Sequence, residues 1–225
     1  MSSFFKKQFL LFYALCVLGD LIATVTENFW LNLVFKPLIV SSLLLFLFNQ
    51  TRVKGASFAL GGLVLSLLGD CLLIFQDLNG LFFIGGLLSF LVAHLLYIVY
   101  YLKSAAAASS KTLRLKPLLL VLFGVYGLLF CYVLYPNLGA LRVPVVAYAS
   151  VLLSMNIFAL NRYGKVSHDN FKGVMTGALF FTASDSLLAI NKFVHPLPLA
   201  GIVIMSTYAI AQYLIARSTL PAKTA

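Results

Sequence analysis

The sequence predicts an all-α fold, a polytopic transmembrane helical bundle with eight spans and both termini on the cytoplasmic side. Of its 225 residues, 62% are hydrophobic and 10% are charged, whereas soluble domains hold about 45–50% and about 25%. Apolar runs of about 20 residues, the length that crosses a bilayer as a helix, recur along the whole chain. The connections between these runs carry lysine and arginine in an alternating pattern, which indicates the orientation.

The apolar runs account for most of the chain and leave no room for a soluble domain. We therefore expect a single transmembrane domain over residues 1–225. Several connections contain turn-forming residues, such as Asn79-Gly80 and Pro136-Asn137. The expected helices cover residues 8–26, 29–48, 56–75, 81–102, 117–135, 141–160, 171–192 and 198–216.

The positions of the basic residues predict which side of the membrane is cytoplasmic, because cytoplasmic loops carry an excess of lysine and arginine. With the N-terminus inside, only Arg142 and Lys192 fall at outer segments, and Lys36 lies within the second run. The net charge of +10 therefore has a topological explanation and does not indicate a nucleic-acid partner. The compact loops favour a bacterial inner (cytoplasmic) membrane. The basic residues expected on the inner side are Lys6, Lys7, Arg52, Lys54, Lys103, Lys111, Arg114, Lys116, Arg162, Lys165, Lys172, Arg217 and Lys223.

Two aspartates lie deep within apolar runs. Asp70 lies in SLLGDCLL (66–73), and Asp185 lies in GALFFTASDSLLAINKF (177–193). A charged side chain in hydrocarbon costs about 2.5–3.5 kcal/mol on insertion scales, so an acid at this depth indicates function. Both runs lead outward, and a rise of about 1.5 Å per residue puts the two carboxyl groups at a similar depth in the outer half of the membrane. For a third acid, Asp20 in the first run, structural and functional roles are equally open.

Polar and small residues recur at helical spacing, which places them on shared helix faces. Such stripes also occur where membrane helices simply pack, because small residues allow close approach and polar groups bond across helices. This packing explanation is the stronger one for Ser66, Thr182 and Gln212. The stripes are Gly62, Ser66, Gly69 and Asp70; Gly86, Phe90, His94, Tyr97 and Tyr101; Thr182, Asp185, Ala189 and Lys192; and Met205, Tyr208 and Gln212.

Five segments between residues 35 and 216 carry a family resemblance. They are FKPL (35–38), SLLGDCLL (66–73), the pattern Gly85-Gly86, Phe90, His94 and Tyr97, then GALFFTASDSLLAINKF (177–193) and MSTYAIAQYLIA (205–216). In this order the combination resembles the YhhN/TMEM86 family of lysoplasmalogenases. The resemblance implies hydrolysis of the vinyl ether bond of a lysoplasmalogen, a lyso-ether-phospholipid. The expected products are a fatty aldehyde and glycerophosphoethanolamine or glycerophosphocholine.

The chemistry of a vinyl ether suits two buried acids. Its β-carbon is protonated to give an oxocarbenium ion, water adds, and the hemiacetal collapses. A carboxyl group in a low-dielectric pocket can keep its proton near neutral pH, while an ionised one can stabilise the cation and activate water. We expect Asp70 and Asp185 to be the acid and base, in either order. Candidates to orient water or the glycerol are His94, Tyr97, Tyr208 and Gln212, and candidates to meet the phosphate are Lys36, Asn191 and Lys192.

Three other function classes compete with this interpretation. In a proton-coupled transporter, Asp70, Asp185 and Lys36 would form a protonation relay, and the solute would cross unchanged. In a structural or receptor-like bundle, the polar stripes would serve packing alone. A metal-dependent lipid amidase would need several membrane histidines, but His168 and His195 fall in connections and only His94 lies within a run. We therefore expect neither a metal nor another cofactor.

Overall fold

The computed structural model describes residues 3–48, 50, 53–105 and 117–220, and this part of the chain contains helices and no strand. Eight long helices make up most of it. They are α1 (Ser3–Val25), α2 (Phe29–Leu47), α3 (Ala56–Ile74), α4 (Gly80–Ala105), α6 (Pro117–Leu134), α7 (Arg142–Leu160), α8 (His168–Phe193) and α9 (Ala200–Arg217). Two short 3₁₀ turns, η1 (Tyr135–Asn137) and η2 (Gly139–Leu141), connect α6 to α7.

All eight helices are long and apolar enough to cross a membrane. The shortest have 18 residues, which at about 1.5 Å per residue nearly matches a hydrocarbon core of about 30 Å. The prediction of an all-α bundle with eight spans is therefore confirmed. The protein is an integral, multi-pass membrane protein.

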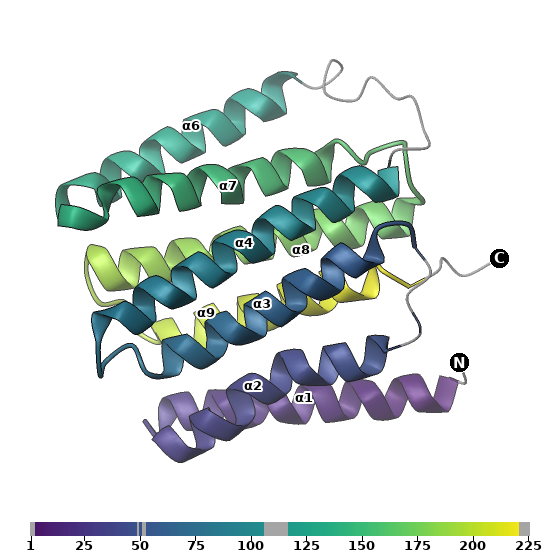
Figure 1. Cartoon of the computed structure of the whole chain (residues 1–225), viewed down its shortest axis with the longest axis horizontal. Coiled ribbons are helices and arrows are strands. Elements are labelled where there is room, and N and C mark those ends of the chain that lie inside the picture. Colours follow the sequence, from purple (N-terminus) through teal and green to yellow (C-terminus); the bar gives the residue numbers. More distant parts are fainter. Residues whose placement is uncertain (1–2, 49, 51–52, 106–116, 221–225) are drawn as a thin grey trace.

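The first helix begins and the last helix ends at the same end of the bundle (Figure 1). We call this end the terminal end. Of the described basic residues, Lys54 and Lys165 lie at connections there and Lys103 lies in the last turn of α4, as the orientation argument requires. Arg52, Lys111, Arg114, Lys116 and Lys223 fall outside the described residues, as does the side chain of Lys6. That the terminal end is cytoplasmic stays a prediction.

Helix ends differ from the expected ones where polar residues prolong a helix beyond its apolar run. Helix α8 begins at His168, ahead of the apolar residues, because Ser167 Oγ caps it by accepting from the backbone N–H of Asn170 at 3.4 Å. Helix α4 likewise continues through Lys103 to Ala105. Hydropathy identifies the part of a helix that fits hydrocarbon, and the backbone continues beyond it wherever it can be capped.

Close helix contacts at glycines bring α3 against α4. A methyl group built at Gly62 would lie 2.5 Å from the Tyr97 ring, and one at Gly69 would lie 2.6 Å from the Phe90 ring. A Cβ atom at either position would therefore push its ring away. These two glycines place Tyr97 and Phe90 in the middle of the bundle, next to Asp70 on α3.

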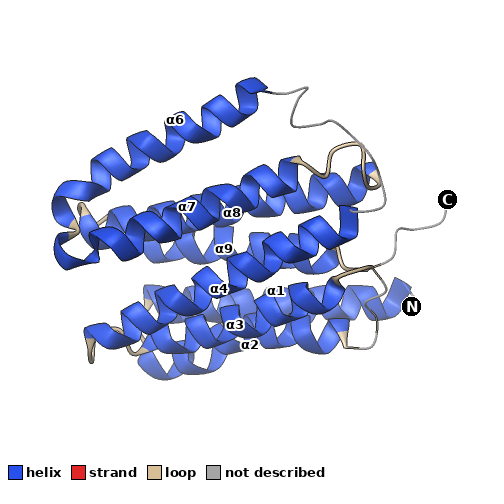
Figure 2. Cartoon of the chain, turned by 45° about the horizontal axis from the view of Figure 1, so that its top comes forward, coloured by secondary structure: helices blue, strands red, loops and turns tan. Residues whose placement is uncertain are grey.

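Helix α6 is the least enclosed of the spans. Large apolar side chains cover it and face outward, among them Leu118, Val121 and Leu128. Figure 2 shows α6 diverging from the bundle toward its Pro117 end. Near its other end, Leu134 is fully buried and packs with Leu138 and Val145. Helix α6 is thus attached mainly at the end opposite the chain termini, which we call the distal end.

A buried arginine links four helices at the terminal end. Arg162, which follows α7, has no exposed surface and donates to Ser104 Oγ on α4 at 2.7 Å and to Asn170 Oδ1 on α8. Asn170 in turn donates to the backbone carbonyl of Ser218, just after α9, at 2.7 Å. The rings of Tyr100 and Tyr101 lie 5.2 Å and 5.3 Å from the guanidinium carbon. This end of the bundle is therefore tied together by polar contacts.

Candidate active site

Asp185 lines an apolar pocket toward the distal end. The pocket lies between α4, α6, α7 and α8 and is open on one side; its empty space, including the part that is open to solvent, is about 440 Å³. Asp185 and the hydroxyl of Tyr148 are the polar groups of its wall. The lining residues are Phe83, Leu87, Phe130, Val145, Tyr148, Ala149, Leu152, Asp185, Leu188, Ala189 and Phe193. Such a wall suits a long hydrocarbon chain that presents one reactive polar group.

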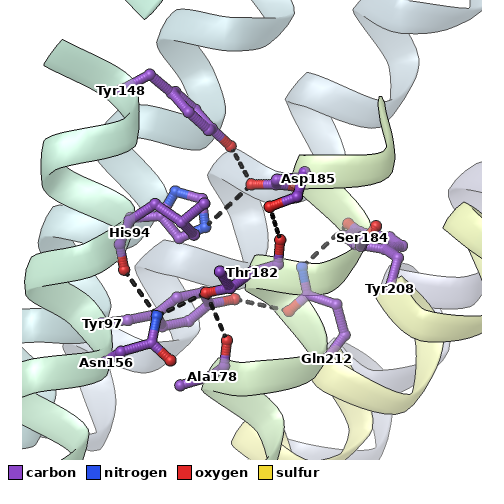
Figure 3. A network of polar contacts seen from close by, with 12 residues as sticks. His94, Tyr97, Tyr148, Asn156, Ala178, Thr182, Ser184, Asp185, Tyr208 and Gln212 are labelled. Atoms are coloured by element: carbon purple, nitrogen blue, oxygen red, sulfur yellow. Dashed lines mark hydrogen bonds and ion pairs between the residues drawn. The ribbon is translucent and has the colours of Figure 1, made fainter. Parts of the chain in front are cut away.

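Two side chains from neighbouring helices converge on the Asp185 carboxyl group (Figure 3). The Tyr148 hydroxyl on α7 donates to Oδ2 at 2.5 Å. His94 Nε2 on α4 lies 3.8 Å from the same oxygen. With 12% of its side chain exposed, Asp185 is held by its neighbours yet open to the pocket.

Tyr148 was not predicted as a site residue. It lies in a long apolar run, where a tyrosine is compatible with simple packing. Tyr148 and Asn156 are eight residues apart, with Leu152 midway, and therefore lie on the same face of α7. These two polar residues on one face were the signal that could have found Tyr148.

Asp70 occupies a closed site with a different set of partners. The Tyr208 hydroxyl on α9 donates to Asp70 Oδ2 at 2.6 Å. Gln212 Nε2 donates to the Tyr208 hydroxyl at 3.0 Å, and the Tyr97 hydroxyl on α4 donates to Gln212 Oε1 at 2.8 Å. Four of the predicted site residues therefore form one chain of hydrogen bonds across α3, α9 and α4. Asp70 is 2% exposed and is not among the residues that line the pocket.

An aromatic ring separates the surroundings of the two acids. The Phe181 ring centroid on α8 lies 4.5 Å from that of His94 and 5.5 Å from that of Tyr208. His94 lies beside Asp185, and Tyr208 is hydrogen-bonded to Asp70. The structure thus brings the two acids into one region of the bundle, on either side of Phe181.

A third set of hydrogen bonds fixes α7 against α8 one turn before Asp185. Asn156 Nδ2 donates to Thr182 Oγ1 at 2.6 Å, and Thr182 Oγ1 donates to the Ala178 carbonyl at 3.0 Å (Figure 3). Both side chains are buried. The bridge joins α7, which carries Tyr148, to α8, which carries Asp185, and so helps to position these two residues. The packing role predicted for Thr182 therefore also supports the site.

The three residues expected to meet a phosphate lie in different places. Lys192 Nζ lies 5.2 Å from the ring centroid of Phe83, a pocket residue, so the ammonium group is near the pocket rim. Asn191 Oδ1 accepts from the backbone N–H of Leu197 at 2.9 Å and holds the connection to α9. Lys36 is on α2, which lies on the opposite side of the bundle from α6 and α7 (Figure 1). The structure brings Lys192, and not Lys36, to the pocket.

Asp20 and Lys36 belong to a separate polar region around α1 and α2. Asp20 is fully buried, and Asn32 Nδ2 donates to its Oδ1 at 3.2 Å. Helix α2, which carries Lys36, packs against both α1 and α3. These residues border the closed Asp70 site and are absent from the pocket wall.

Among the described residues, no three histidine, cysteine, aspartate or glutamate side chains lie close enough together to hold a metal ion. Asp70 and Asp185 each have a tyrosine hydroxyl as partner instead. The polar groups in the pocket wall are a carboxyl group and a phenol, and the imidazole of His94 lies behind the carboxyl group; all three are proton donors or acceptors.

Comparison with known proteins relates the chain to membrane proteins of similar length. It is 34% identical over 222 residues to the protein named lysoplasmalogenase TMEM86A from Bos taurus. This alignment covers 94% of this chain and 88% of the relative. It is 36% identical over 193 residues to lysoplasmalogenase TMEM86B from Sus scrofa, covering 84% and 75%. An uncharacterized membrane protein YhhN from Escherichia coli O157:H7 is 34% identical over 128 residues, covering 56% and 57%.

No solved structure matches the chain. The model of the YhhN family matches residues 31–219, which include Asp70, Asp185, the residues around them and the whole pocket wall. Helix α1, with Asp20, lies before the matched residues. Because the match covers most of the chain, this protein belongs to the YhhN family.

Proposed function

We propose that this protein is a lysoplasmalogenase, a hydrolase that cleaves the vinyl ether bond of a lysoplasmalogen. The products would be a fatty aldehyde and glycerophosphoethanolamine or glycerophosphocholine. The observation that carries the proposal is a carboxyl group, Asp185, in the wall of an otherwise apolar pocket within the membrane. The names of the TMEM86A and TMEM86B relatives support the same reaction.

The pocket and its rim match the two parts of such a substrate. The apolar wall would take the alkenyl chain, and Lys192 at the rim would meet the phosphate. Asp185 and Lys192 are seven residues apart on α8, which corresponds to about 10 Å along the helix. In the substrate, the three glycerol carbons separate the vinyl ether oxygen from the phosphate ester. The long Lys192 side chain can adjust to cover the difference between this spacing in the substrate and the distance along the helix.

We assign the acid role to Asp185, because it is the carboxyl group that meets the pocket. Tyr148 donates to Oδ2, which leaves Oδ1 to carry the proton that goes to the β-carbon of the vinyl ether. Asp70 would then act as the second, ionised acid. Its charge would stabilise the oxocarbenium ion from behind Phe181, since charges act over longer distances in a low-dielectric interior. Tyr208, Gln212 and Tyr97 would hold Asp70 in that state by hydrogen bonding.

We propose further that the terminal end faces the cytoplasm, in agreement with its basic residues, in a bacterial inner membrane. The pocket wall includes Phe83 near the start of α4, Val145 near the start of α7 and Phe193 at the end of α8. All three lie toward the distal end. The pocket would accordingly be reached from the outer leaflet.

The test is aldehyde release by the purified protein in detergent. Three lysolipids with the same chain and head group would be compared, with a vinyl ether, an ester or a saturated ether at the first glycerol position. We expect turnover of the vinyl ether alone. A folded wild-type protein that releases no aldehyde would contradict the proposal. In that case, solute flux across a pH gradient would test the transporter alternative.

A further inference from the structure

His94 is a buried imidazole held in place by aromatic rings. It has no exposed surface. The centroid of its ring lies 4.5 Å from that of Phe181 at an angle of 77°, and 5.4 Å from that of Tyr148 at an angle of 80°. These edge-to-face contacts oppose rotation of the ring. Figure 3 shows the imidazole directed toward the Asp185 carboxyl group.

Neither ring nitrogen of His94 has a hydrogen-bond partner among the described residues. A neutral imidazole offers one donor and one acceptor, and buried polar groups without partners are both costly and rare. An apolar residue of the same shape would pack in this aromatic setting without that cost. The nitrogen atoms therefore need an explanation that packing does not supply.

The separation between His94 and Asp185 is too long for a direct hydrogen bond. Nε2 lies 3.8 Å from Asp185 Oδ2, beyond the range of about 2.7–3.2 Å for a direct hydrogen bond. Polar groups separated by more than about 3.5 Å are commonly joined through water. A water molecule set to one side of the line between the two atoms can contact both once the side chains packed around Nε2, which has almost no accessible surface, move aside to admit it. Asp185 also faces the pocket, so such a water would be close to a bound substrate.

We propose that His94 and Asp185 together hold the water molecule that the reaction consumes, and that His94 takes up its proton. This inference rests on the proposed function and changes the expected division of labour. Asp185 and His94 contact the reacting atoms, whereas Asp70 acts on the cation through space.

The proton balance of the cycle closes with these two residues. Protonated Asp185 gives its proton to the β-carbon, and the vinyl ether becomes an oxocarbenium ion. The oxygen of water bonds to the cationic carbon while one of its protons passes to His94 Nε2, which yields a neutral hemiacetal. His94 then returns this proton to the glycerol oxygen as the carbon–oxygen bond breaks. The hemiacetal hydroxyl proton passes to Asp185, so aldehyde and alcohol leave with both residues restored.

The experiment compares aldehyde release by wild type, His94→Phe and His94→Ala, with imidazole added to each. We expect His94→Phe to lose about 10²-fold or more in kcat, as for loss of a general base, with unchanged KM and a melting temperature no lower than that of wild type. Imidazole should restore activity to His94→Ala, which has space for it, and not to His94→Phe. His195→Phe, in the connection before α9, is the matched control and should behave as wild type.

Each outcome decides the question. If His94→Phe keeps wild-type kcat, or if imidazole fails to restore a folded His94→Ala, the water site is wrong. If activity is lost together with a clear drop in melting temperature, His94 serves packing, which also overturns it. Should His94→Phe not fold, His94→Ala with and without imidazole carries the same test. An inactive wild type would remove the proposed function itself, whereas an active wild type beside an active His94→Phe removes only this inference.

Discussion

Asp70 and Asp185 are the same residue type in two different settings. Asp185 has a tyrosine partner and faces a pocket. Asp70 also has a tyrosine partner, but Tyr208 is bonded onward to Gln212, and Asp70 is almost completely enclosed. A buried acid is therefore not enough to locate chemistry. Access to a space that a substrate can enter distinguishes Asp185, which can give its proton to the substrate, from Asp70, which acts on it at a distance.

The largest effect should come from exchanging the acids themselves. We expect Asp185→Asn to reduce kcat for aldehyde release by about 10²- to 10⁴-fold, because the proton donor is lost. Asp70→Asn can still accept the hydrogen bond from Tyr208 and should lose only about fivefold, since a charge acting across one intervening ring contributes about 1 kcal/mol. Initial rates with both folded variants would check this. Equal losses of kcat in the two variants would contradict this difference and would mean that both acids take part directly in the reaction.

The tyrosine partners should separate catalysis from stability. Tyr148→Phe removes the donor to Asp185 Oδ2 and is expected to lower kcat by about 10- to 100-fold, which corresponds to a hydrogen bond to the carboxylate that forms as Asp185 gives up its proton. Tyr208→Phe removes the centre of the Asp70 chain and leaves Gln212 Nε2 without its acceptor. Its main effect should be a loss of about 1–3 kcal/mol of stability.

Melting curves and initial rates measured on the same preparations would show both effects. The opposite pattern, a destabilised Tyr148→Phe and a slow but stable Tyr208→Phe, would reverse the roles that we give to the two sites.

A smaller effect is expected from filling the pocket beside Asp185. Ala189→Leu adds bulk to the wall, and we expect KM for a long-chain substrate to rise about tenfold while a shorter chain is less affected, because added methylenes in a filled site are opposed by overpacking. Ala183→Leu on the same helix is the matched control, since Ala183 is exposed and outside the pocket wall. Identical KM values for both variants across a chain-length series would argue against this pocket as the binding site.

The smallest effect concerns the two lysines. We expect Lys192→Gln to raise KM about threefold, as for loss of an exposed charge contact, and the difference should shrink at high salt. Lys36→Gln, on the Asp70 side, should leave KM unchanged. Titrating substrate at low and high ionic strength measures both. A salt-sensitive KM in Lys36→Gln alone would place the head group on the other side of the bundle.

Much of the fold was predictable because the bilayer imposes a length and a composition on each span. Apolar runs such as 56–75 correspond closely to helices such as Ala56–Ile74. The grouping of Tyr97, Tyr208, Gln212 and Asp70 was partly predictable, since each lies on a polar stripe. Helical spacing shows which face a residue occupies, but it contains no information on which helices are neighbours. For that reason Lys36 was grouped with Lys192, and Tyr148 was missed altogether.

The arginine cluster at the terminal end has a practical consequence for work with the isolated protein. Arg162 joins α4 to α8 by hydrogen bonds, and Asn170 joins α8 to the end of α9, whereas the pocket walls at the distal end meet mostly through apolar side chains. Detergent molecules compete with apolar contacts much more than with buried hydrogen bonds. Harsh short-chain detergents should therefore remove activity while circular dichroism still reports full helix content, and activity should return on transfer into lipid nanodiscs.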